Sequence, residues 1–431
     1  MPAGLKEWLS LLERRHPREI DLGLDRVRAV WERLGSPLPA KRCVVVAGTN
    51  GKGSTVAVTV ALLESLGLRC GAYTTPHIHV YNERVRFTGR DADDAQFIEA
   101  FERIEAVRGD VSLSYFEFGT LAAFMILGQQ DLDVAVMEIG LGGRLDAVNL
   151  LDGDCAVITP VGLDHQEYLG ETRDEIGFEK AGIIRSGRPL VLGDRDPPAT
   201  VLRAARELAA PVRRIGRDFE LSRAGDHAVF RYGGEELELP RPPLAGTHQF
   251  DNAATALAAV LELQAGAIRQ PDALRRGLAS VRLRGRFERV ADAPAVWIDV
   301  GHNPLGAEVI ADTLARHAAA DGLRRVRCVL GMLADKDAAA AAHALRDVVS
   351  EWYCAGLGSN RGQSGDRLAG QIRPAVAPAP VRAFDTVPAA LEAALADSEA
   401  ADGVLVFGSF LTADAARRAL GAGPAASPRC C

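Results

Sequence analysis

The sequence lacks the features that mark several large classes of protein. It contains no Cys-x-x-Cys pair among its seven cysteines, so it indicates neither a zinc site nor a disulfide framework. It has no uninterrupted apolar run near the ~20 residues of a membrane span and no apolar leader, so we expect a cytoplasmic protein without a membrane partner. The net charge of −7 argues against nucleic acid as a partner, because nucleic-acid binders usually present a basic face.

What is present predicts an α/β enzyme. The chain has 431 residues, of which 48% are hydrophobic, and this is enough apolar material for two cores. A helical region over residues 5–35 precedes continuous apolar runs that alternate with segments of helical spacing, which is typical of a parallel sheet covered on both faces. A polar, alternating stretch over residues 219–239 indicates a small antiparallel sheet.

The βα pattern restarts near residue 288. We therefore predict an N-terminal domain over residues 1–287 and a second α/β domain over residues 288–431. The segment RLRGRFERV just before the restart is a candidate hinge, and PAVAPAP (374–380) a surface connection. The tail from about residue 421 is expected to be disordered.

Residues 44–55, VVVAGTNGKGST, indicate a phosphate-binding loop. A β-forming run leads into a glycine-rich turn, and a helix is predicted from about Ser54 to Leu66. Backbone N–H groups of such a turn can surround phosphate oxygens, and Lys52 would reach the terminal phosphates. Gly53 stands where the usual pattern has a hydroxyl residue, so a metal would need oxygen ligands from elsewhere. The predicted nucleotide-binding residues of the loop are Thr49, Asn50, Gly51, Lys52, Gly53 and Ser54.

Polar residues follow the next predicted strands. Glu138 ends one strand, Asp164 and His165 follow the next, and a helix with the capping pattern Thr172-x-x-Glu175 carries Lys180. Each has an ordinary structural interpretation: a salt-bridge partner, a loop residue or a solvated lysine. Their occurrence on successive strand ends beside a phosphate loop favours an active site.

These segments belong to a longer series of motifs. GTNGKGS, YTTPHIHVYNERVR, SYFEFGT, MEIGLGGRLDAVN, LDHQEYLG, EKAGIIR, HQFDNAATA, RGRFE, DVGHNP, GMLADKD and VFGSF occur in this order. The chain resembles the folylpolyglutamate synthases, especially the bacterial bifunctional form that is also a dihydrofolate synthase. The resemblance runs from IDLGLDRV (20–27) to VFGSF (406–410). The related Mur ligases share the loop and the general reaction, but not YFEFGT or EKAGI.

The resemblance implies a fold, a reaction and its partners. The fold is an N-terminal P-loop ATPase domain, like the central domain of Mur ligases, followed by a Rossmann-like C-terminal domain. The reaction is an ATP-dependent amide ligation through an acyl phosphate, which joins L-glutamate to 7,8-dihydropteroate and to the γ-carboxylate of tetrahydrofolates. The family is mostly monomeric, so a monomer is expected.

The resemblance also implies two Mg²⁺ ions. One is held by Glu138 and the hydroxyl of Thr75, where most relatives have serine. The other is held by Glu138, His165 and a carbamylated Lys180, whose carbamate oxygens are ligands that Mg²⁺ prefers. Lys52, Glu138, His165 and Lys180 are therefore the predicted catalytic residues.

The other end of the nucleotide is also assigned by resemblance, to Asn252, Arg286, Asp299 and His302. Arg286 and Asp299 would straddle the candidate hinge, with ATP between the domains. A helix N-cap is the structural alternative for Asn252, and a strand-end turn is the alternative for DVGHNP.

The substrate sites complete the assignment. The residues matched to the pterin site are Asp21, Leu22, Ser114, Tyr115, Phe116, Glu117 and Asp146. Phe116 offers an aromatic face and Asp146 can accept ring N–H donors, whereas Phe118 is better explained as a core residue. Glutamate is assigned to the C-terminal domain, near Asp335, Lys336 and Ser409.

Other functions remain open at this point. The chain could be a monofunctional folylpolyglutamate synthase or a Mur-type ligase. A regulatory P-loop NTPase would leave EKAGI, YFEFGT and DVGHNP unexplained. A dinucleotide-dependent oxidoreductase would need a G-x-G-x-x-G after a strand, and the second predicted domain has no such motif. Release of ADP that depends on both glutamate and a pteridine carboxylate discriminates among these classes.

Overall fold

The computed structural model describes residues 2, 4–16, 20–359 and 361–421. These residues form two compact units. The first contains the described residues up to Pro243 together with Phe250–Val281, and the second contains Leu244–Gln249 and the described residues from Arg282 onwards. The predicted boundary at residues 287/288 lies a few residues further along the chain than this division.

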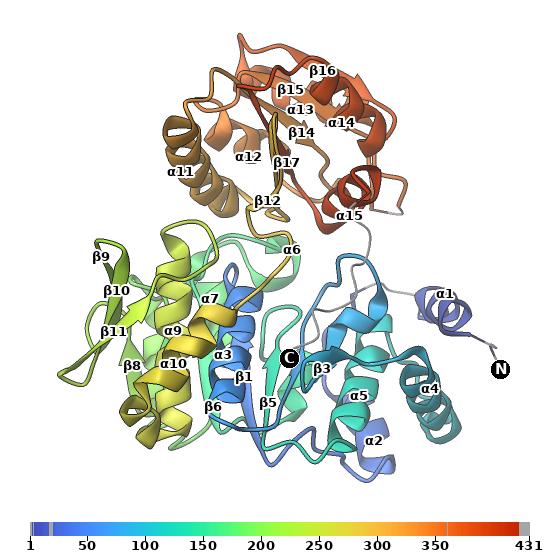
Figure 1. Ribbon diagram of the computed structural model, residues 1–431. Coiled ribbons are helices and arrows are strands. Elements are labelled where there is room, and N and C mark those ends of the chain that lie inside the picture. Colours follow the sequence, from blue (N-terminus) through green and yellow to red (C-terminus); the bar gives the residue numbers. More distant parts are fainter. Residues whose placement is uncertain (1, 3, 17–19, 360, 422–431) are drawn as a thin grey trace. The chain divides into compact units, whose positions relative to one another are not determined.

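The first unit is built on a mixed sheet with the strand order β4-β3-β2-β5-β1-β6-β7-β8 (Figure 1). The strands from β2 to β8 in this order pair in parallel, and β3 and β4 add antiparallel pairs at one edge. The bounds are β1 (Arg42–Ala47), β2 (Cys70–Tyr73), β3 (Val85–Phe87), β4 (Arg90–Asp91), β5 (Val134–Glu138), β6 (Cys155–Ile158), β7 (Leu190–Leu192) and β8 (Val212–Arg214).

Strand β1 is central because its side chains are apolar on both faces. Val44, Val45 and Val46 are at most 1% exposed, as expected for a strand covered by helices on both sides. Val46 pairs with Glu138 of β5 on one side and with Val157 of β6 on the other. The carboxyl ends of these three strands therefore meet at one edge, where the loops that follow them carry the predicted site.

Two groups of helices surround this sheet. In Figure 1, α1, α2, α4 and α5 gather beside the β3 edge, whereas α9 and α10 lie near α3. The helices are α1 (Leu5–Arg15), α2 (Asp25–Arg33), α3 (Lys52–Ser65), α4 (Asp94–Arg108), α5 (Tyr115–Gly128), α6 (Gln166–Leu169), α7 (Arg173–Ala181), α8 (Ala199–Glu207), α9 (His248–Leu263) and α10 (Pro271–Ser280), with 3₁₀ turns η1 (Tyr81–Arg84), η2 (Ala147–Leu150) and η3 (Ala265–Arg269).

Helices α3 and α10 pack at close range although they are far apart in sequence. A Cβ atom on Gly277 of α10 would lie 2.9 Å from the carbonyl oxygen of Ala61 and 2.9 Å from Cα of Leu62. Only glycine permits this approach of the two backbones. The end of α9 is tied to the same sheet, because Arg42 of β1 donates to the carbonyl of Leu263 at 3.0 Å.

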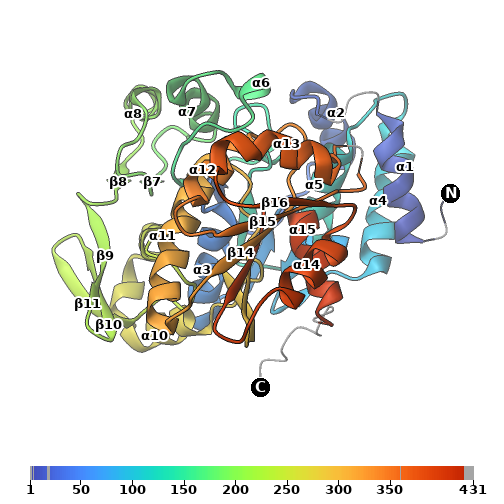
Figure 2. The same cartoon turned by 90° about the horizontal axis from the view of Figure 1, so that it is seen from above.

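The polar alternating stretch forms a three-stranded antiparallel sheet, as predicted. Its strands are β9 (Phe219–Ala224), β10 (His227–Tyr232) and β11 (Glu235–Pro240), and Phe230 of β10 pairs with Leu221 and Leu237. Figure 2 shows this sheet beside α10, at one margin of the unit.

The second unit has a six-stranded sheet with the order β12-β13-β17-β14-β15-β16. Only β12 is antiparallel to its neighbour in this sheet of described residues. The strands are β12 (Glu288–Asp292), β13 (Ala295–Ile298), β14 (Val326–Leu330), β15 (Glu351–Ala355), β16 (Val381–Phe384) and β17 (Gly403–Phe407), and the helices are α11 (Pro304–Asp321), α12 (Ala338–Leu345), α13 (Gly365–Val376), α14 (Val387–Ala396) and α15 (Phe410–Ala419). The α/β prediction is confirmed for both units.

Three local predictions need correction. Helix α3 starts at Lys52 rather than Ser54, because Gly51 turns the chain with a φ of +90°. Helix α9 starts at His248, so Asn252 lies inside the helix and is not its N-cap. Residues 374–376 belong to the last turn of α13, so only residues 377–380 of this segment are a connection.

Other expectations concern the chain as a whole. Within the described ranges, no helix is both long and apolar enough to cross a membrane. The cysteines at positions 43, 70, 155, 328 and 354 are buried and free. The tail from residue 422, with Cys430 and Cys431, lies outside the described residues.

Candidate active site

The glycine-rich turn between β1 and α3 is shaped by close packing. A Cβ atom on Gly48 would lie 1.8 Å from Oγ1 of Thr159 at the end of β6, so a larger residue is excluded there. Thr49 ties the turn to the loop that follows β6. Its N–H donates to the carbonyl of Pro160 at 2.9 Å, and its hydroxyl bonds to the backbone of Gly162. The loop is therefore held in place before any ligand binds, with the N-terminus of α3 at its end.

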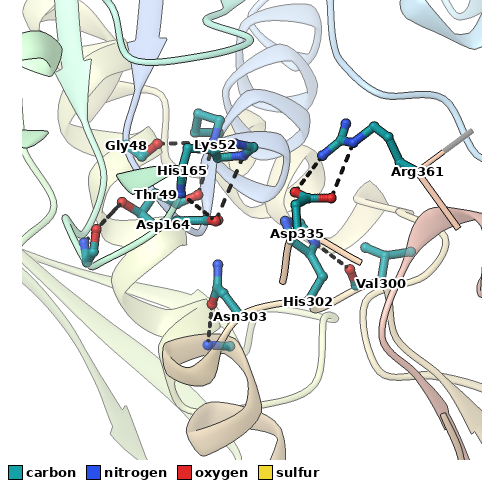
Figure 3. Close-up of polar contacts among 12 residues, drawn as sticks. Gly48, Thr49, Lys52, Asp164, His165, Val300, His302, Asn303, Asp335 and Arg361 are labelled. Atoms are coloured by element: carbon teal, nitrogen blue, oxygen red, sulfur yellow. Dashed lines mark hydrogen bonds and ion pairs between the residues drawn. The ribbon is translucent and has the colours of Figure 1, made fainter. Parts of the chain in front are cut away.

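Two lysines meet at the carbonyl groups of this turn. Lys52 Nζ donates to the carbonyl oxygens of Gly48 and Thr49 at 3.1 and 3.0 Å (Figure 3). Lys180 Nζ, from α7, donates to the same Gly48 oxygen at 2.8 Å. Lys52 and the helix N-terminus concentrate positive charge where anionic phosphate would bind.

Lys180 is almost fully buried, with 3% exposure. Its pKa falls to about 7, chiefly because burial penalises the ammonium and secondly because Lys52 repels it, while Asp164 and Asp146 act in the opposite direction. A substantial fraction of this amine is therefore neutral at physiological pH, unlike an ordinary lysine.

The predicted metal ligands stand on loops that border the turn. Glu138 is 5% exposed at the end of β5, and its Oε2 accepts the N–H of Thr75 at 3.2 Å. His165 has a φ of +52°, and its N–H donates to Oδ1 of Asp164 at 2.9 Å. Figure 3 shows Asp164 and His165 beside Lys52.

No cluster of three or more His, Cys, Asp or Glu side chains suited to a metal is found in the part of the chain that the structure describes. A cation at this place would thus depend on a threonine, on Lys180 in modified form and on the substrate's own oxygens. Mg²⁺ is usually held by hard oxygen donors, namely one or two protein carboxylates together with the phosphates of the substrate. The residues present fit that ion.

Two glycines, whose role no local sequence pattern indicated, explain how Lys180 reaches the turn. A Cβ atom on Gly143 would lie 2.8 Å from the carbonyl of Glu179, and one on Gly182 would lie 2.5 Å from Cα of Arg144. The GLGGR and EKAGI segments therefore pack backbone to backbone. Arg144 adds a salt bridge to Glu179 at 2.8 Å.

Asn252 lies on α9 against the same turn. It is 5% exposed, and a Cβ atom on Gly51 would lie 2.4 Å from its Oδ1. The positive φ of Gly51 and this contact both require glycine at position 51. Asn252 is thereby brought to the loop that precedes Lys52.

Phe116 and Asp146 flank one further glycine. A Cβ atom on Gly140 would lie 2.5 Å from Cζ of Phe116 and 3.3 Å from Oδ2 of Asp146. Asp146 is 2% exposed and accepts the N–H groups of Leu141 and Val148 at 2.8 and 2.9 Å. Burial raises its pKa to about 7, against the effect of these hydrogen bonds. The aromatic ring and the carboxyl group predicted for a pterin therefore occur side by side.

Ser114 and Glu117, which the resemblance assigns to the pterin site, also have a structural role. They form a capping box at the start of α5: Glu117 N–H donates to Ser114 Oγ at 3.2 Å, and Ser114 N–H donates to Glu117 Oε2 at 2.7 Å. The pattern S-x-x-E was visible in SYFE. Tyr115 is the first residue of this helix, and Phe118 is fully buried in the core, as predicted.

Asp21 and Leu22 lie in the segment between α1 and α2. Leu22 packs against the core, and Asp21 forms a salt bridge with Arg26 at 3.0 Å. The next residue, Gly23, donates its N–H to the carbonyl of Leu145 at 3.3 Å, so the segment adjoins the loop that carries Asp146.

In the second unit, Arg286 and Asp299 occur together. Burial raises the pKa of Asp299, whereas Arg286 and the N–H groups of Gly301 and Phe287 lower it. Those N–H groups donate to Asp299 at 2.6 and 2.8 Å. The guanidinium of Arg286 lies 5.6 Å from the ring centroid of Phe410.

The remaining predicted residues of this unit have local partners. Nδ1 of His302 lies 3.0 Å from the carbonyl of Val300, and Asp335 forms a salt bridge with Arg361 at 2.7 Å (Figure 3). Ser409 is the N-cap of α15, where its Oγ accepts the N–H of Thr412 at 3.0 Å. Lys336 follows Asp335 in the loop before α12, and its N–H donates to the carbonyl of Leu333.

Comparison with known families covers most of the chain. Residues 46–260 match the family model "Mur ligase middle domain" and residues 285–410 match "Mur ligase, glutamate ligase domain". A dihydrofolate synthase/folylpolyglutamate synthase of Escherichia coli (strain K12) is 43% identical over 95% of this chain and 93% of that protein.

Solved structures give the same result. A structure described as E. coli FolC in complex with DHPP and ADP superposes with a TM-score of 0.92 at 41% identity, over 98% of this chain and 99% of that one. A bifunctional folylpolyglutamate synthase/dihydrofolate synthase with Mn, AMPPNP and L-glutamate bound superposes with a TM-score of 0.87 at 40% identity, over 97% of this chain and 98% of that one.

Proposed function

Because the chain belongs to the dihydrofolate synthase/folylpolyglutamate synthase family of Mur ligases, we propose that it is an ATP-dependent ligase that attaches L-glutamate to 7,8-dihydropteroate and to tetrahydrofolates. The resemblance predicted from the motifs is thereby confirmed. The observation that carries the proposal is the meeting of Lys52 and Lys180 at the Gly48 carbonyl, beside the start of α3.

The reaction explains why two lysines meet there. A carboxylate does not react with an amine, so its oxygen first takes the terminal phosphoryl group of ATP, and ADP leaves. The amine of glutamate then attacks the acyl phosphate, an amide bond forms, and phosphate is expelled with loss of a proton. Lys52 and the helix N-terminus stabilise the negative charge of the transferring group, because they are oriented before the reaction begins.

Glu138, Thr75 and His165 would hold Mg²⁺, with Lys180 contributing after modification. When bound there, Mg²⁺ would supply positive charge that offsets the charge of the phosphate groups. The hydrogen bond from Thr75 N–H keeps Glu138 turned toward the TTPH loop. Asp164 is bonded to the backbone of His165 and orients that residue.

We propose that Lys180 is carbamylated. A neutral amine attacks CO₂, an N–C bond forms and a proton is lost, which leaves an anionic carbamate. The depressed pKa of Lys180 supports the first requirement, a neutral amine. Its surroundings support the second, because the nearby Lys52 would pair with the carbamate. NMR of protein equilibrated with ¹³C-bicarbonate would detect the carbamate, and Lys180→Arg is the blank.

Residues for the rest of the nucleotide are also proposed. Asn252 is proposed for the base or phosphate end on the strength of its contact with the Gly51 turn. Arg286, Asp299 and His302 are proposed for the ribose and phosphate, and the Arg286 cation over Phe410 supports a site for an anion or an aromatic base there. Asp335, Lys336 and Ser409 remain proposals for glutamate.

The pterin is proposed to lie against Phe116, with Asp146 accepting its ring N–H groups. Because Gly140 brings these two side chains together, they support one site for a flat heterocycle. Asp21, Leu22 and Tyr115 would border it. Ser114 and Glu117 are proposed to act mainly through the capping box at the start of α5.

One assay tests both activities. Purified protein receives ATP, Mg²⁺ and glutamate with either 7,8-dihydropteroate or tetrahydrofolate, and the products are separated by chromatography. Dihydrofolate and a lengthened tetrahydrofolate are the expected products. Extension of tetrahydrofolate without formation of dihydrofolate would make the enzyme a monofunctional folylpolyglutamate synthase. Chromatography with light scattering tests the proposed monomer.

A further inference from the structure

Five polar side chains are linked in a row, from Ser112 just before α5 to Glu117 in its first turn. We define this row, Ser112, His16, Asp21, Arg26 and Glu117, as the clasp. On one side, Arg26 bridges two carboxylates: its guanidinium contacts Asp21 Oδ2 at 3.0 Å and Glu117 Oε1 at 3.1 Å. On the other side, His16 joins Asp21 Oδ2 at 3.1 Å to Ser112 Oγ at 2.8 Å.

The two ends of the clasp are fixed on α5 and the residues before it. Glu117 is 3% exposed, and its second carboxylate oxygen is occupied by the N–H of Ser114. A buried carboxylate is stable only when its oxygens have such partners. Arg26 therefore links a rigid anchor, the start of α5, to Asp21.

The described residues between α1 and α2, which are residues 16 and 20–24, lie in no helix or strand. Helix α1 ends at Arg15 and α2 begins at Asp25 without a side-chain cap at Leu24. Arg26 adds a hydrogen bond to the carbonyl of Asp21 at 2.8 Å, and Gly23 N–H reaches the carbonyl of Leu145. The described residues of this segment are thus tied to α5 on one side and to the Asp146 loop on the other.

We propose that Arg26 is a positioning residue for the pterin acceptor, which acts by holding Asp21 and Leu22 beside the start of α5. This inference rests on the proposed function. Arg26 does not touch the substrate. It fixes the segment that would form one wall of the acceptor site, so its loss lowers affinity for the pterin acceptor and leaves the phosphate loop and its lysines unchanged.

The main variant is Arg26→Gln, with Arg33→Gln as its matched control. Arg33 ends the same helix and links it to α4 instead of α5, and its guanidinium donates to the backbone carbonyls of Val107 and Arg108 rather than to carboxylates. We expect Arg26→Gln to raise KM for 7,8-dihydropteroate and tetrahydrofolate about tenfold or more, with KM for ATP within twofold of wild type. Arg33→Gln should leave all three within twofold.

A coupling test separates positioning from general stability. Glu117→Gln retains an oxygen for the Ser114 N–H but loses the charge that Arg26 contacts. If the clasp works as a unit, the double variant Arg26→Gln/Glu117→Gln raises the acceptor KM no further than the stronger single variant. Independent, multiplying effects would contradict the proposal.

Further outcomes are equally decisive. A lower Tm with unchanged acceptor KM, or an equal rise of KM for ATP and acceptor, would reduce Arg26 to a structural residue and overturn the inference. If Arg26→Gln fails to fold, Arg26→Lys replaces it. Because lysine cannot bridge two carboxylates in the same way, we expect an acceptor KM about threefold above wild type, and a wild-type KM would refute the idea. Wild-type protein that forms neither product would instead refute the proposed function.

Discussion

Two buried cations, one in each unit, show opposite designs. Arg327 on β14 has a side chain 5% exposed and is paired with Asp402, equally buried, at 2.9 Å, while Glu351 lies 3.4 Å from its Nε. Lys180 on α7 is as deeply buried, yet it donates a hydrogen bond to the backbone carbonyl of Gly48. One cation is neutralised by carboxylates in contact with it, and the other stands beside a second lysine.

The pKa values follow this difference. Burial lowers the pKa of Arg327, but its hydrogen bonds to Asp402 and Tyr353 outweigh that effect and raise it above the usual value. Burial and Lys52 together bring the pKa of Lys180 down to about 7. A cation needed only for folding is paired, whereas a cation kept short of charge compensation is available for an anion or for chemistry. Variants at Lys180 and at the Arg327–Asp402 pair test this difference.

The largest effect is expected at Lys180. Lys180→Met should lower ligation with both acceptors by about 10³-fold, because the site loses the carbamate proposed to help hold Mg²⁺. The far-UV circular dichroism and Tm of the variant should remain those of a folded protein, since methionine fills the space without a buried charge. Lys41→Met, at an exposed lysine, is the control. Normal turnover by folded Lys180→Met would remove the functional half of the comparison.

At the paired cation, the loss should appear in stability. Asp402→Ala leaves Arg327 buried with a single, more distant carboxylate, and we expect the free energy of unfolding to fall by about 3–5 kcal/mol. Urea unfolding measures this value. Ligation per folded molecule should be unchanged, and the double variant Arg327→Met/Asp402→Leu should regain most of the stability. An unstable double variant would show that packing, not the unpaired charge, causes the loss.

Asp146 extends the comparison to a buried acid. Its pKa is 3.8 in an ordinary setting and about 7 here, so the folded protein binds a proton more tightly than the unfolded chain. The stability that comes from this protonation is complete below pH 4 and is lost as pH rises to about 7. Relative to Asp146→Asn, wild type should therefore lose about 2–4 kcal/mol over that interval, by urea unfolding at several pH values. Parallel curves for the two proteins would exclude the raised pKa.

Arg286 gives the smallest expected effect. Its guanidinium lies over the ring of Phe410, and its charge lowers the pKa of the nearby Asp299. Arg286→Ala should raise KM for ATP about tenfold, the equivalent of one charged hydrogen bond, with KM for the pterin acceptor unchanged. Unchanged kinetics at subsaturating ATP would argue against a nucleotide contact. Arg282→Ala, at a nearby arginine without an assigned role, is the control.

The sequence predicted the parts of the site that depend on local patterns. The run VVVAGTNGKGS predicted β1, the turn and α3, and Thr172 begins α7 through the expected capping box. Glu138 stands at a strand end, as predicted, because the apolar run before it could only be a buried strand.

What the sequence left open depends on tertiary contacts. Asp335 forms an ion pair with Arg361, and Arg26 forms one with Glu117 of another helix. The partners are far apart in the sequence, so no residue spacing predicts either pair. The approach of Gly143 to α7 also arises only when two distant segments pack. The alternative role of Asn252 as an N-cap is wrong, because α9 already begins at His248, four residues before it.

The packing of α10 on α3 has a consequence for the growing chain on the ribosome. Gly277 of α10 meets the backbone of α3 at Ala61 and Leu62, so the first unit is complete only after residue 277 has been made. The roughly 200 residues that separate the two helices take about 10–40 s to translate at about 5–20 residues per second. During that interval the face of α3 that packs on α10 stays uncovered. Nascent chains arrested before α10 should therefore be bound by chaperones and cleaved by proteases more readily than chains arrested just after it.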